Sequence, residues 1–390
     1  MNQGKYVFTQ LFELINRYEF EQCVDRYKGD FRVKRFSCWE QFLVMGFAQL
    51  SFRESLRDIE YCLRSIQKKL YHCGIKTTVS RTTLAGANEK RNWEIYADLA
   101  KLLMSRAVPL YKGDNKLSKE LGTVVYAFDS TTIGLCMSLF SWATYSSQKK
   151  AVKVHVLLNT DGYIPEFVHI TMGNKQDMVL MDNLNYRAGC FYLMDKAYVD
   201  FDRLYRIELS RAFFVTRAKE NMSYTIKETK AVNHQEGIIK DELVQMKRWH
   251  TRRWYPISIR RIEYKDATTG KMLSFLTNNL LLDAVVVARL YKERWKVELF
   301  FKWIKQHLRI KKFYGNSENA VKTQIWIAVC NYLQLAILKK TLKTDMSLNQ
   351  MMQVISVSLF EKCNIQELFS NQETKTVSIQ PTLFENLTGQ

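Results

Sequence analysis

The chain has 390 residues, of which 47% are hydrophobic and 25% charged, a composition typical of a folded soluble protein. It contains no run of about eighteen uncharged apolar residues, so the sequence predicts no membrane-spanning helix. Charges interrupt the apolar residues of the opening segment, MNQGKYVFTQLFELINRYEF, which argues against a signal peptide. The formal net charge of +19 favours a polyanionic partner, and nucleic acid fits best, because each neutralised phosphate releases counterions. A ribosomal or membrane-surface protein with this charge would be less typical at this length.

Cysteine usage and length narrow the class further. The eight cysteines are scattered and form no close CxxC pair, a pattern of reduced, mostly buried thiols rather than of a zinc site or a disulfide framework. We therefore expect a cytoplasmic protein. The length suggests roughly two or three domains. With only 4 Pro and 15 Gly, long linkers are not expected.

Residues 1–118 are predicted to be helical. Apolar residues recur at helical spacing in residues 8–27, 38–50, 55–70 and 80–108. Ser80 and the threonines that follow suit the start of a helix, which puts Arg81 near a helix N-terminus, where it can meet a phosphate or a DNA groove. A helical bundle with a polar cap explains the same residues equally well. We assign residues 1–75 to a helical N-terminal DNA-binding domain and residues 76–118 to a helical connector.

β-branched and aromatic runs bounded by turns begin near residue 119. The predicted strands are TVVYAFDS, AVKVHVLL, YIPEFVHITM, CFYLMD and AFFVTRA. The second and third form a hairpin across the turn at residues 159–162. The segments QDMVLMDNLNYRA and VDFDRLYRIELSR are predicted helices. A hairpin followed by alternating strands and helices indicates an α/β fold with a mixed sheet.

The remainder of the chain divides into a β-rich part and a helical part. Residues 219–278 are β-like and polar (YTIKET, GIIKDELVQM, YPISIRRIEY, KMLSFLTNN), whereas residues 281–340 are strongly helical. We therefore predict an α/β core that is split by a β-rich insertion. The expected boundaries are 119–218 and 279–345 for the core, 219–278 for the insertion and 346–390 for a C-terminal tail.

Two aspartates follow apolar strand runs. Asp129 ends VVYAFD and Asp195 ends FYLMD. In open α/β sheets functional groups gather at the carboxyl ends of strands, so two such strands can present two carboxylates side by side. An aspartate after a strand is also a good turn or N-cap residue, and for either aspartate alone this structural role is the better explanation.

A third acid, Glu298, lies in the aromatic stretch YKERWKVELFFKWIKQHL, residues 291–308. At about 100° per residue on an ideal helix, Tyr291, Arg294, Glu298 and Lys305 fall within an arc of about 60°. The remaining arc carries residues predicted to pack, which are Trp295, Leu299, Phe300, Phe301, Trp303, Ile304 and Leu308. An ion pair between Arg294 and Glu298 on a solvated face is the alternative. A solvated face is usually wider, so the narrow stripe predicts a polar, buried partner.

Three clustered carboxylates need a cation. Oxygen ligands without clustered His or Cys favour Mg²⁺, with Mn²⁺ as a substitute, over zinc. Two such ions about 4 Å apart activate a water or hydroxyl and stabilise the leaving oxygen in phosphodiester displacement. Basic residues around Glu298 are suited to hold a DNA strand, and these are Lys292, Arg294, Lys296, Lys302, Lys305, Arg309, Lys311 and Lys312.

Asp129, Asp195 and Glu298 in this order, with the pattern Tyr-x2-Arg-x3-Glu-x6-Lys, resemble the DDE transposases of the insertion-sequence-four family. FFVTRAK, SFLTNN and FYGNSENAVKTQIWIA are similar to the usual surroundings of these residues. FSCWEQFLVMGFAQLSFRESLRDIE is similar to a helical domain often found at the front of such transposases. The resemblance covers most of the chain except about the last forty residues. It implies an RNase H-like core with a β-rich insertion between the second Asp and the Glu.

The resemblance also implies an activity and partners. The reaction would be metal-dependent strand cleavage at transposon ends, followed by joining of the 3′-hydroxyl to target DNA. The three acids would bind metal, and Tyr291, Arg294 and Lys305 would grip phosphates. Arg81, Lys302 and Arg309 are further predicted DNA contacts. Expected partners are double-stranded DNA and a second copy of the chain in a homodimer that pairs two ends. The protein would be nucleoid-associated in the bacterial cytoplasm when bound to DNA.

Seven other residues are weaker candidates. Some relatives excise through a DNA hairpin aided by a Trp in the insertion, for which Trp249 and Trp254 are candidate counterparts. Ser130 and Lys196 are candidates to line the acidic site. Better explained by structure are Asn174 and Asp177, which suit a turn and a helix cap, and His155, which lies in a strand alternation.

Two other functions fit part of the same pattern. A metal-dependent nuclease of this fold would cut DNA without joining it. A catalytically inactive, transposase-derived DNA-binding protein would act as a repressor or architectural factor. The intact acidic triad argues against the inactive protein, whereas the sequence does not separate cutting from joining.

Overall fold

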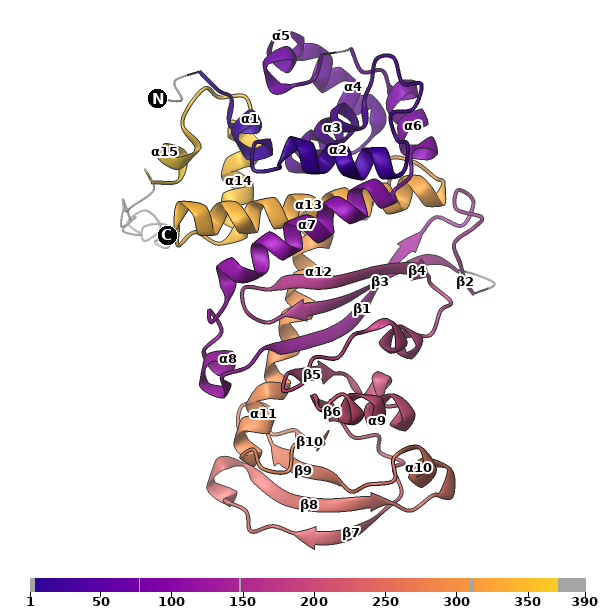
Figure 1. Cartoon of the computed structure of the whole chain (residues 1–390), viewed down its shortest axis with the longest axis vertical. Helices are drawn as coiled ribbons and strands as arrows, with labels where there is room; N and C mark the ends of the chain where they lie inside the picture. The colour runs from indigo at the N-terminus through magenta and orange to yellow at the C-terminus, as the bar shows by residue number, and fades with distance from the viewer. Residues whose placement is uncertain (1–3, 77, 147–148, 309–311, 371–390) are drawn as a thin grey trace, which may run out of the picture.

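The computed structural model describes residues 4–76, 78–146, 149–308 and 312–370. Helices gather at one end of the molecule, and one ten-stranded mixed sheet extends from the middle to the opposite end (Figure 1). The predicted α/β fold with a preceding all-α part is confirmed. Predictions that concern Arg309, Lys311 and residues 371–390 lie outside the described residues.

The first third of the chain is helical, as predicted. It comprises α1 (Val7–Phe12), α2 (Arg17–Arg26), α3 (Cys38–Leu50), α4 (Leu56–Ser65), α5 (Gln67–Leu70), the 3₁₀ helix η1 (Tyr71–Cys73), α6 (Arg81–Lys90), α7 (Glu94–Tyr111) and α8 (Lys116–Leu121). α3 begins where the sequence predicts, because Ser37 and Glu40 form a capping box. Residues 8–27, where apolar residues recur at helical spacing, belong to two helices. The Asn16 side chain accepts two backbone N–H groups and starts α2 as a separate helix.

The central sheet has the strand order β4-β3-β1-β5-β6 in its first half. The ten strands are β1 (Val125–Leu135), β2 (Thr144–Ser146), β3 (Lys149–Asn159), β4 (Ile164–Met172), β5 (Phe191–Met194), β6 (Phe213–Arg217), β7 (Tyr224–Thr229), β8 (Ile238–Met246), β9 (Ile259–Lys265) and β10 (Met272–Thr277). β1, β3 and β4 pair antiparallel, whereas β5 pairs parallel with both β1 and β6. Three antiparallel strands followed by two parallel ones form the RNase H-like sheet that the resemblance implies.

The predicted β-rich insertion continues this sheet. β10 pairs antiparallel with β6, and β9, β8 and β7 follow in that order (Figure 1). The short helices η4 (His234–Glu236) and α10 (Trp249–Trp254) lie between these strands in the chain. The four strands predicted from the sequence are all present, and they lengthen one edge of the core sheet.

Helices cover both faces of the core sheet. α12 (Trp295–His307) packs on β1 and β3, α7 packs on β4, and α13 (Glu318–Leu342) packs along α7. α9 (Phe201–Leu209) packs on β6, and α11 (Ala284–Glu293) packs on β5, β6 and β10. α13 is apolar and long enough to cross a membrane, but 89% of its most apolar window is buried inside the protein. It is the central helix of the main hydrophobic core.

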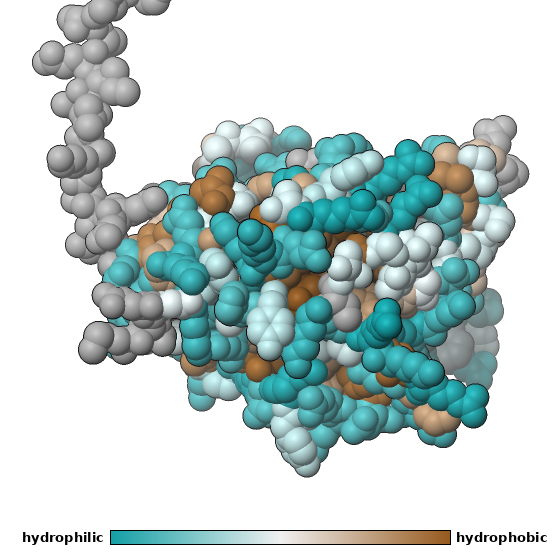
Figure 2. Space-filling view, turned by 90° about the horizontal axis from the view of Figure 1, so that it is seen from above, coloured by the Kyte–Doolittle hydropathy of each residue, from teal (hydrophilic) through white to brown (hydrophobic). Residues whose placement is uncertain are grey.

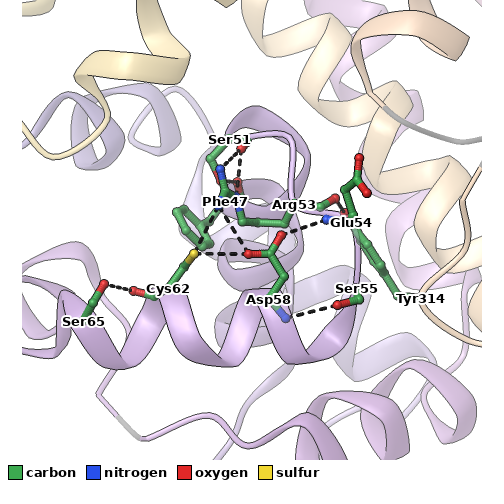
Figure 3. Close-up of polar contacts among 9 residues, drawn as sticks. All are labelled: Phe47, Ser51, Arg53, Glu54, Ser55, Asp58, Cys62, Ser65 and Tyr314. Atoms are coloured by element: carbon green, nitrogen blue, oxygen red, sulfur yellow. Dashed lines mark hydrogen bonds and ion pairs between the residues drawn. The ribbon is translucent and has the colours of Figure 1, made fainter.

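The segment that follows α12 is fixed to the N-terminal helices. The Tyr314 hydroxyl donates to the backbone carbonyl of Arg53 at 2.7 Å (Figure 3). The Arg53 guanidinium is in turn held by the Ser51 carbonyl at 2.9 Å and by Asp58 at 3.3 Å. Beyond α13, α14 (Leu348–Ser358) and α15 (Ile365–Ser370) pack against the same helical part. The N-terminal helices and the segment around Tyr314 therefore form one packed unit.

One predicted helix is wrong. Residues 176–188 form only the 3₁₀ helix η2 (Asp177–Asn183) followed by irregular chain. Polar contacts with the sheet hold this segment, because the Ser130 hydroxyl donates to Asp177 at 2.8 Å and Lys153 pairs with it at 3.1 Å. These long-range contacts replace the regular helix that the local pattern favours.

Candidate active site

The parallel pairing of β1 and β5 brings Asp129 and Asp195 to neighbouring positions. Phe128 of β1 pairs with Met194, the last residue of β5, and each aspartate is the next residue along its chain. The prediction that Asp129 ends its strand is wrong, because β1 continues to Leu135. The strand that ends is β5. Beyond this point no described strand pairs with the edge of β1 that faces β5, so both carboxylates lie at an open part of the sheet.

The Glu298 carboxylate is linked to the Asp129 carboxylate through Arg294. Arg294 lies at the junction of α11 and α12 with helical backbone angles. Its guanidinium contacts the Asp129 carboxylate at 3.3 Å and the Glu298 carboxylate at 2.6 Å. The i,i+4 ion pair of the alternative interpretation is therefore present, but the same arginine also binds β1. The side chains of Arg294, Asp129 and Glu298 are 13%, 19% and 33% exposed, so the bridge is largely buried.

The two other residues of the predicted stripe also face the sheet. The Tyr291 hydroxyl donates to Asp195 at 3.4 Å. The Lys305 ammonium donates to the Thr131 hydroxyl, and to the Thr132 carbonyl at 3.0 Å. The narrow polar arc thus meets the carboxylates and β1, as its spacing predicts. Thr131 and Thr132 were missed, although the hydroxyl run after Asp129 (DSTT) signals them.

The apolar arc of the same helix is not fully packed. Trp295 is 57% exposed and Leu299 is 41% exposed, so the prediction that both are covered is wrong. Phe300, Phe301 and Ile304 are buried in the main core, as predicted. Part of the helix surface next to the polar stripe is therefore left open.

Burial and neighbouring acids perturb Asp129. Burial raises the pKa of its carboxyl from the ordinary 3.8 to about 6. The Ser130 backbone N–H, at 2.8 Å, and the Arg294 guanidinium oppose this rise, whereas the negative charges of Glu298 and Asp195 add to it. The three acids therefore act on one another electrostatically, with Arg294 as the cation between two of them. A raised carboxyl pKa in such a cluster is typical of a functional site.

The donor set fits a hard divalent cation in its chemistry. All three acids offer carboxylate oxygens, which Mg²⁺ and Mn²⁺ prefer. Among the residues that the structure describes, however, no three His, Cys, Asp or Glu side chains converge closely enough to form a ready metal site. The Arg294 guanidinium lies between Asp129 and Glu298 and supplies the positive charge there.

The weaker candidates lie at different distances from the acids. Ser130 holds Asp129 through its backbone N–H, and its hydroxyl donates to Asp177 on the side of η2. Lys196 directly follows Asp195, and its ammonium lies 3.6 Å from Glu220. Asn174 lies in the turn before η2.

His155 has the surroundings of a structural residue. Its side chain is fully buried, and burial lowers the pKa of the imidazole to about 4, so the ring is neutral at pH 7. Its Nε2 is 2.9 Å from the Thr171 hydroxyl, and its Nδ1 is 3.7 Å from Asp177. Lys153, which the sequence analysis missed, joins the same cluster.

The remaining predicted contacts lie on outer elements. Arg81 is the exposed first residue of α6, whose Ser80 side chain caps it as predicted. Lys302 is exposed on α12. Trp249 and Trp254 are the first and last residues of α10 and are 66% and 52% exposed. Seen from above, the end formed by the N-terminal helices is mainly hydrophilic (Figure 2).

Fold and site together define an RNase H-like protein with a cluster of three acids and one bridging arginine. Comparison with known families identifies it further. The model described as "Transposase DDE domain" matches residues 120–334, and the model described as "Domain of unknown function (DUF4372)" matches residues 3–76. The chain belongs to the family of transposases with a DDE domain, as the sequence resemblance predicts.

Named relatives agree with this assignment. The putative transposase y4zB of Sinorhizobium fredii is 32% identical over 286 residues, which are 72% of this chain and 78% of the relative. The probable transposase for insertion sequence element IS5377 of Geobacillus stearothermophilus is 27% identical, over 63% of this chain and 65% of the relative. The putative transposase for insertion sequence element IS4SA of Synechocystis is 24% identical, over 71% and 76%.

Among solved structures, the chain is similar to the piggyBac transposase in a synaptic complex with hairpin DNA. The TM-score is 0.46 and the sequence identity 10%, with 96% of this chain and 84% of that chain covered.

Replacing Arg294 by alanine is expected to destabilise the protein by roughly 2–3 kcal/mol at pH 8. This is less than the 3–5 kcal/mol typical of a fully buried pair, because Glu298 is one-third exposed. The guanidinium lowers the pKa of Asp129, so its removal should raise that pKa further above 6. At pH 4 Asp129, whose pKa is about 6, is protonated and no longer needs the guanidinium, so the loss should shrink.

Urea denaturation at pH 4 and pH 8 measures this effect. Arg289→Ala is the matched control, because Arg289 pairs with Glu120 at the surface, where both side chains are 48% exposed. We expect the control to change the free energy of unfolding by less than about 1 kcal/mol. An equal loss at both pH values for Arg294→Ala would show that the arginine acts by packing alone.

Proposed function

We propose that this protein is an active transposase that moves an insertion sequence by cutting DNA at the element ends and joining each 3′-hydroxyl to target DNA. The carrying observation is the Arg294 bridge between Asp129 and Glu298, with Asp195 on the adjacent parallel strand. The bridge and the strand pairing together place acids from three distant segments at one part of the sheet. A salt bridge confined to the helix would not need Asp129.

Asp129, Asp195 and Glu298 would hold Mg²⁺ or Mn²⁺ in this protein. When bound, the metal supplies charge that activates the attacking oxygen and stabilises the leaving one. Arg294 is suited to grip a phosphate with two N–H groups, and Lys305 acts as a compact positive charge. Tyr291 would orient Asp195, since its hydroxyl already donates to that carboxylate.

The proposed partners are double-stranded DNA and a second copy of the chain that pairs the two ends in a homodimer. Support comes from the formal charge of +19 and from the exposed basic residues of the helical part, which include Arg57, Arg64, Lys68, Lys69 and Arg81. Lys302 and Arg309 would extend the contact beyond the acids. Trp249 and Trp254 would stack on bases if excision passes through a hairpin. The site of action would be nucleoid DNA in the bacterial cytoplasm.

The test uses purified protein, Mg²⁺ and DNA that carries the inverted repeats flanking the gene. Joined products support the transposase. Nicks without joining would select a nuclease of the same fold. Binding without chemistry, unchanged when Asp129 is replaced, would select the inactive DNA-binding protein.

Replacing Lys305 by alanine is expected to weaken binding to element-end DNA and to reduce its salt dependence. Its ammonium lies beside Thr131, two residues after Asp129, where a phosphate near the scissile bond would pass. The slope of log K against log salt should fall by about one. Fluorescence anisotropy at several salt concentrations measures it, with Lys101→Ala on α7 as a charge-matched control. An unchanged slope would remove Lys305 from the DNA contact.

A further inference from the structure

A groove of about 1080 Å³ lies behind the helix that carries Glu298. It is bordered by the C-terminal ends of α7 and α13, by the β3–β4 turn and by the start of α14. In Figure 1 the ends of α7 and α13 and this turn lie on the same side of the molecule. From α12 the groove receives Lys296, Leu299, Phe300 and Trp303, which project from the side opposite to Glu298. The groove is therefore separate from the acidic site.

Lysines dominate the charge of this groove. The charged residues that line it are Lys116, Lys296, Lys339, Lys340, Lys343, Asp114, Glu293 and Asp345. Lys340 pairs with Asp114 at 2.6 Å, and Lys296 pairs with Glu293. Within the described part of the chain, Lys116, Lys339 and Lys343 form no ion pair. Three lysines are thus available for an anion.

Two lining residues adopt backbone conformations that favour glycine. Tyr163 has φ +62° and Lys343 has φ +53°. Gly162 packs on the Tyr111 ring so closely that a Cβ would lie 1.9 Å from a ring carbon, and the Tyr332 hydroxyl donates to the Tyr163 carbonyl at 2.8 Å. The turn is therefore held firmly and does not need a tyrosine. Tyr163 in this turn and Lys343 at the C-terminal end of α13 are kept at an energetic cost, which is typical of functional positions.

Two buried polar atoms of residues that line the groove have no hydrogen-bond partner among the residues that the structure describes. These are Nε1 of Trp303, a donor, and Oδ1 of Asn349, an acceptor. Unsatisfied buried groups are unfavourable, and a ligand that offers both a carbonyl and an amino group would satisfy them. The edge of a nucleobase offers both.

We propose that this groove binds a single-stranded segment of DNA next to the element end, and this rests on the proposed transposase function. Phosphates would contact Lys116, Lys339 and Lys343, and a base would stack on Tyr163, which is 37% exposed. Trp303 and Asn349 would turn their unpartnered atoms toward the edge of a base. Cleavage at an element end releases strands that need such a site.

The size of the groove favours a single strand over a duplex. Its volume is slightly above the roughly 300–1,000 Å³ of sites for small ligands, enough for a few nucleotides but not for a double helix. Aromatic rings interleaved with lysines are the usual means of binding unpaired strands, because every base has a face for stacking. A duplex hides these faces.

Tyr163→Gly and Lys343→Gly test the proposal without harming the fold. Glycine suits both backbone conformations, so we expect each variant to be at least nearly as thermally stable as the wild type. Affinity for a short single-stranded DNA of mixed sequence should fall by roughly five- to a hundredfold in Tyr163→Gly. In Lys343→Gly the slope of log K against log salt should fall by about 0.7.

Arg211→Gly is the matched control. Arg211 is exposed, has φ +54° and lies outside the groove, so its replacement also relieves the backbone and removes one positive charge. Its affinity for the single strand should stay within about twofold of wild type, since it contacts no part of the groove. Anisotropy is measured in EDTA with the single strand and with a duplex of equal length.

The outcomes separate this proposal from the transposase proposal, because binding in EDTA needs neither metal nor cleavage. Unchanged single-strand affinity in both groove variants would overturn it. An equal loss of duplex affinity would show that the groove holds duplex backbone, which would also overturn it. Loss of single-strand affinity alone, with a protein that does not cut element ends, would support the groove and count against the catalytic proposal.

Discussion

Replacing Asp129 by asparagine is expected to abolish strand cleavage and strand transfer, with a loss of at least about 10³-fold. Asparagine keeps the shape of the side chain but removes the charge that a metal ion needs. The substitution also leaves Arg294 paired with Glu298, so the helix should stay in place. Binding to element-end DNA should remain within a few-fold of wild type. Gel assays of nicked and joined products measure the chemistry, and anisotropy measures the binding.

Asp195→Asn and Glu298→Gln should give the same result, because the three acids are proposed to act as one unit. Asp182→Asn is the control, since Asp182 lies on η2 and pairs with Arg203 at 2.7 Å and with Arg206 at 3.0 Å. It should leave cleavage nearly unchanged. If Glu298→Gln fails to fold, or cuts at the wild-type rate, the glutamate has only the structural role of an ion pair.

In the absence of Mg²⁺, Asp129→Asn is expected to stabilise the protein by up to about 3 kcal/mol above pH 6. Burial and the neighbouring acids raise the pKa of Asp129 from 3.8 to about 6, so the folded protein disfavours the ionised form. The wild type should therefore lose stability relative to the variant as the pH rises from about 4 to 6. Below pH 4 the two should be equal. Urea denaturation across this pH range measures the difference.

Mg²⁺ should offset most of this difference. A cation that binds the folded wild type alone stabilises it by about 2.7 kcal/mol at a hundred times its dissociation constant. The midpoint of thermal unfolding should rise with Mg²⁺ in the wild type and stay constant in Asp129→Asn. This result is independent of catalysis. An equal response of both proteins, or none in the wild type, would count against metal binding by Asp129.

Local patterns were sufficient for most elements and for the choice of candidate acids. The spacing of Tyr291, Arg294, Glu298 and Lys305 is a property of one helix, so its period reveals a shared face before any partner is known. Alternation and turn residues similarly predicted the β3–β4 hairpin and the strands of the insertion. The same acids and spacing also pointed to the family, since they lie in its matched region.

Tertiary structure decided what those residues touch. The position of the end of β5 relative to Asp129 depends on pairing between strands that are distant in the chain, so no local pattern predicts it. Packing also determines that Arg294 contacts two carboxylates and that Trp295 is exposed. It likewise determines that residues 176–188 form a short 3₁₀ helix instead of the predicted α-helix. The groove lined by Lys116, Lys339 and Lys343 is formed by several separate elements, so the sequence of no single element predicts it. Helical period and strand alternation arise from backbone geometry within a few residues, whereas these contacts arise from the free energy of burying distant segments against one another.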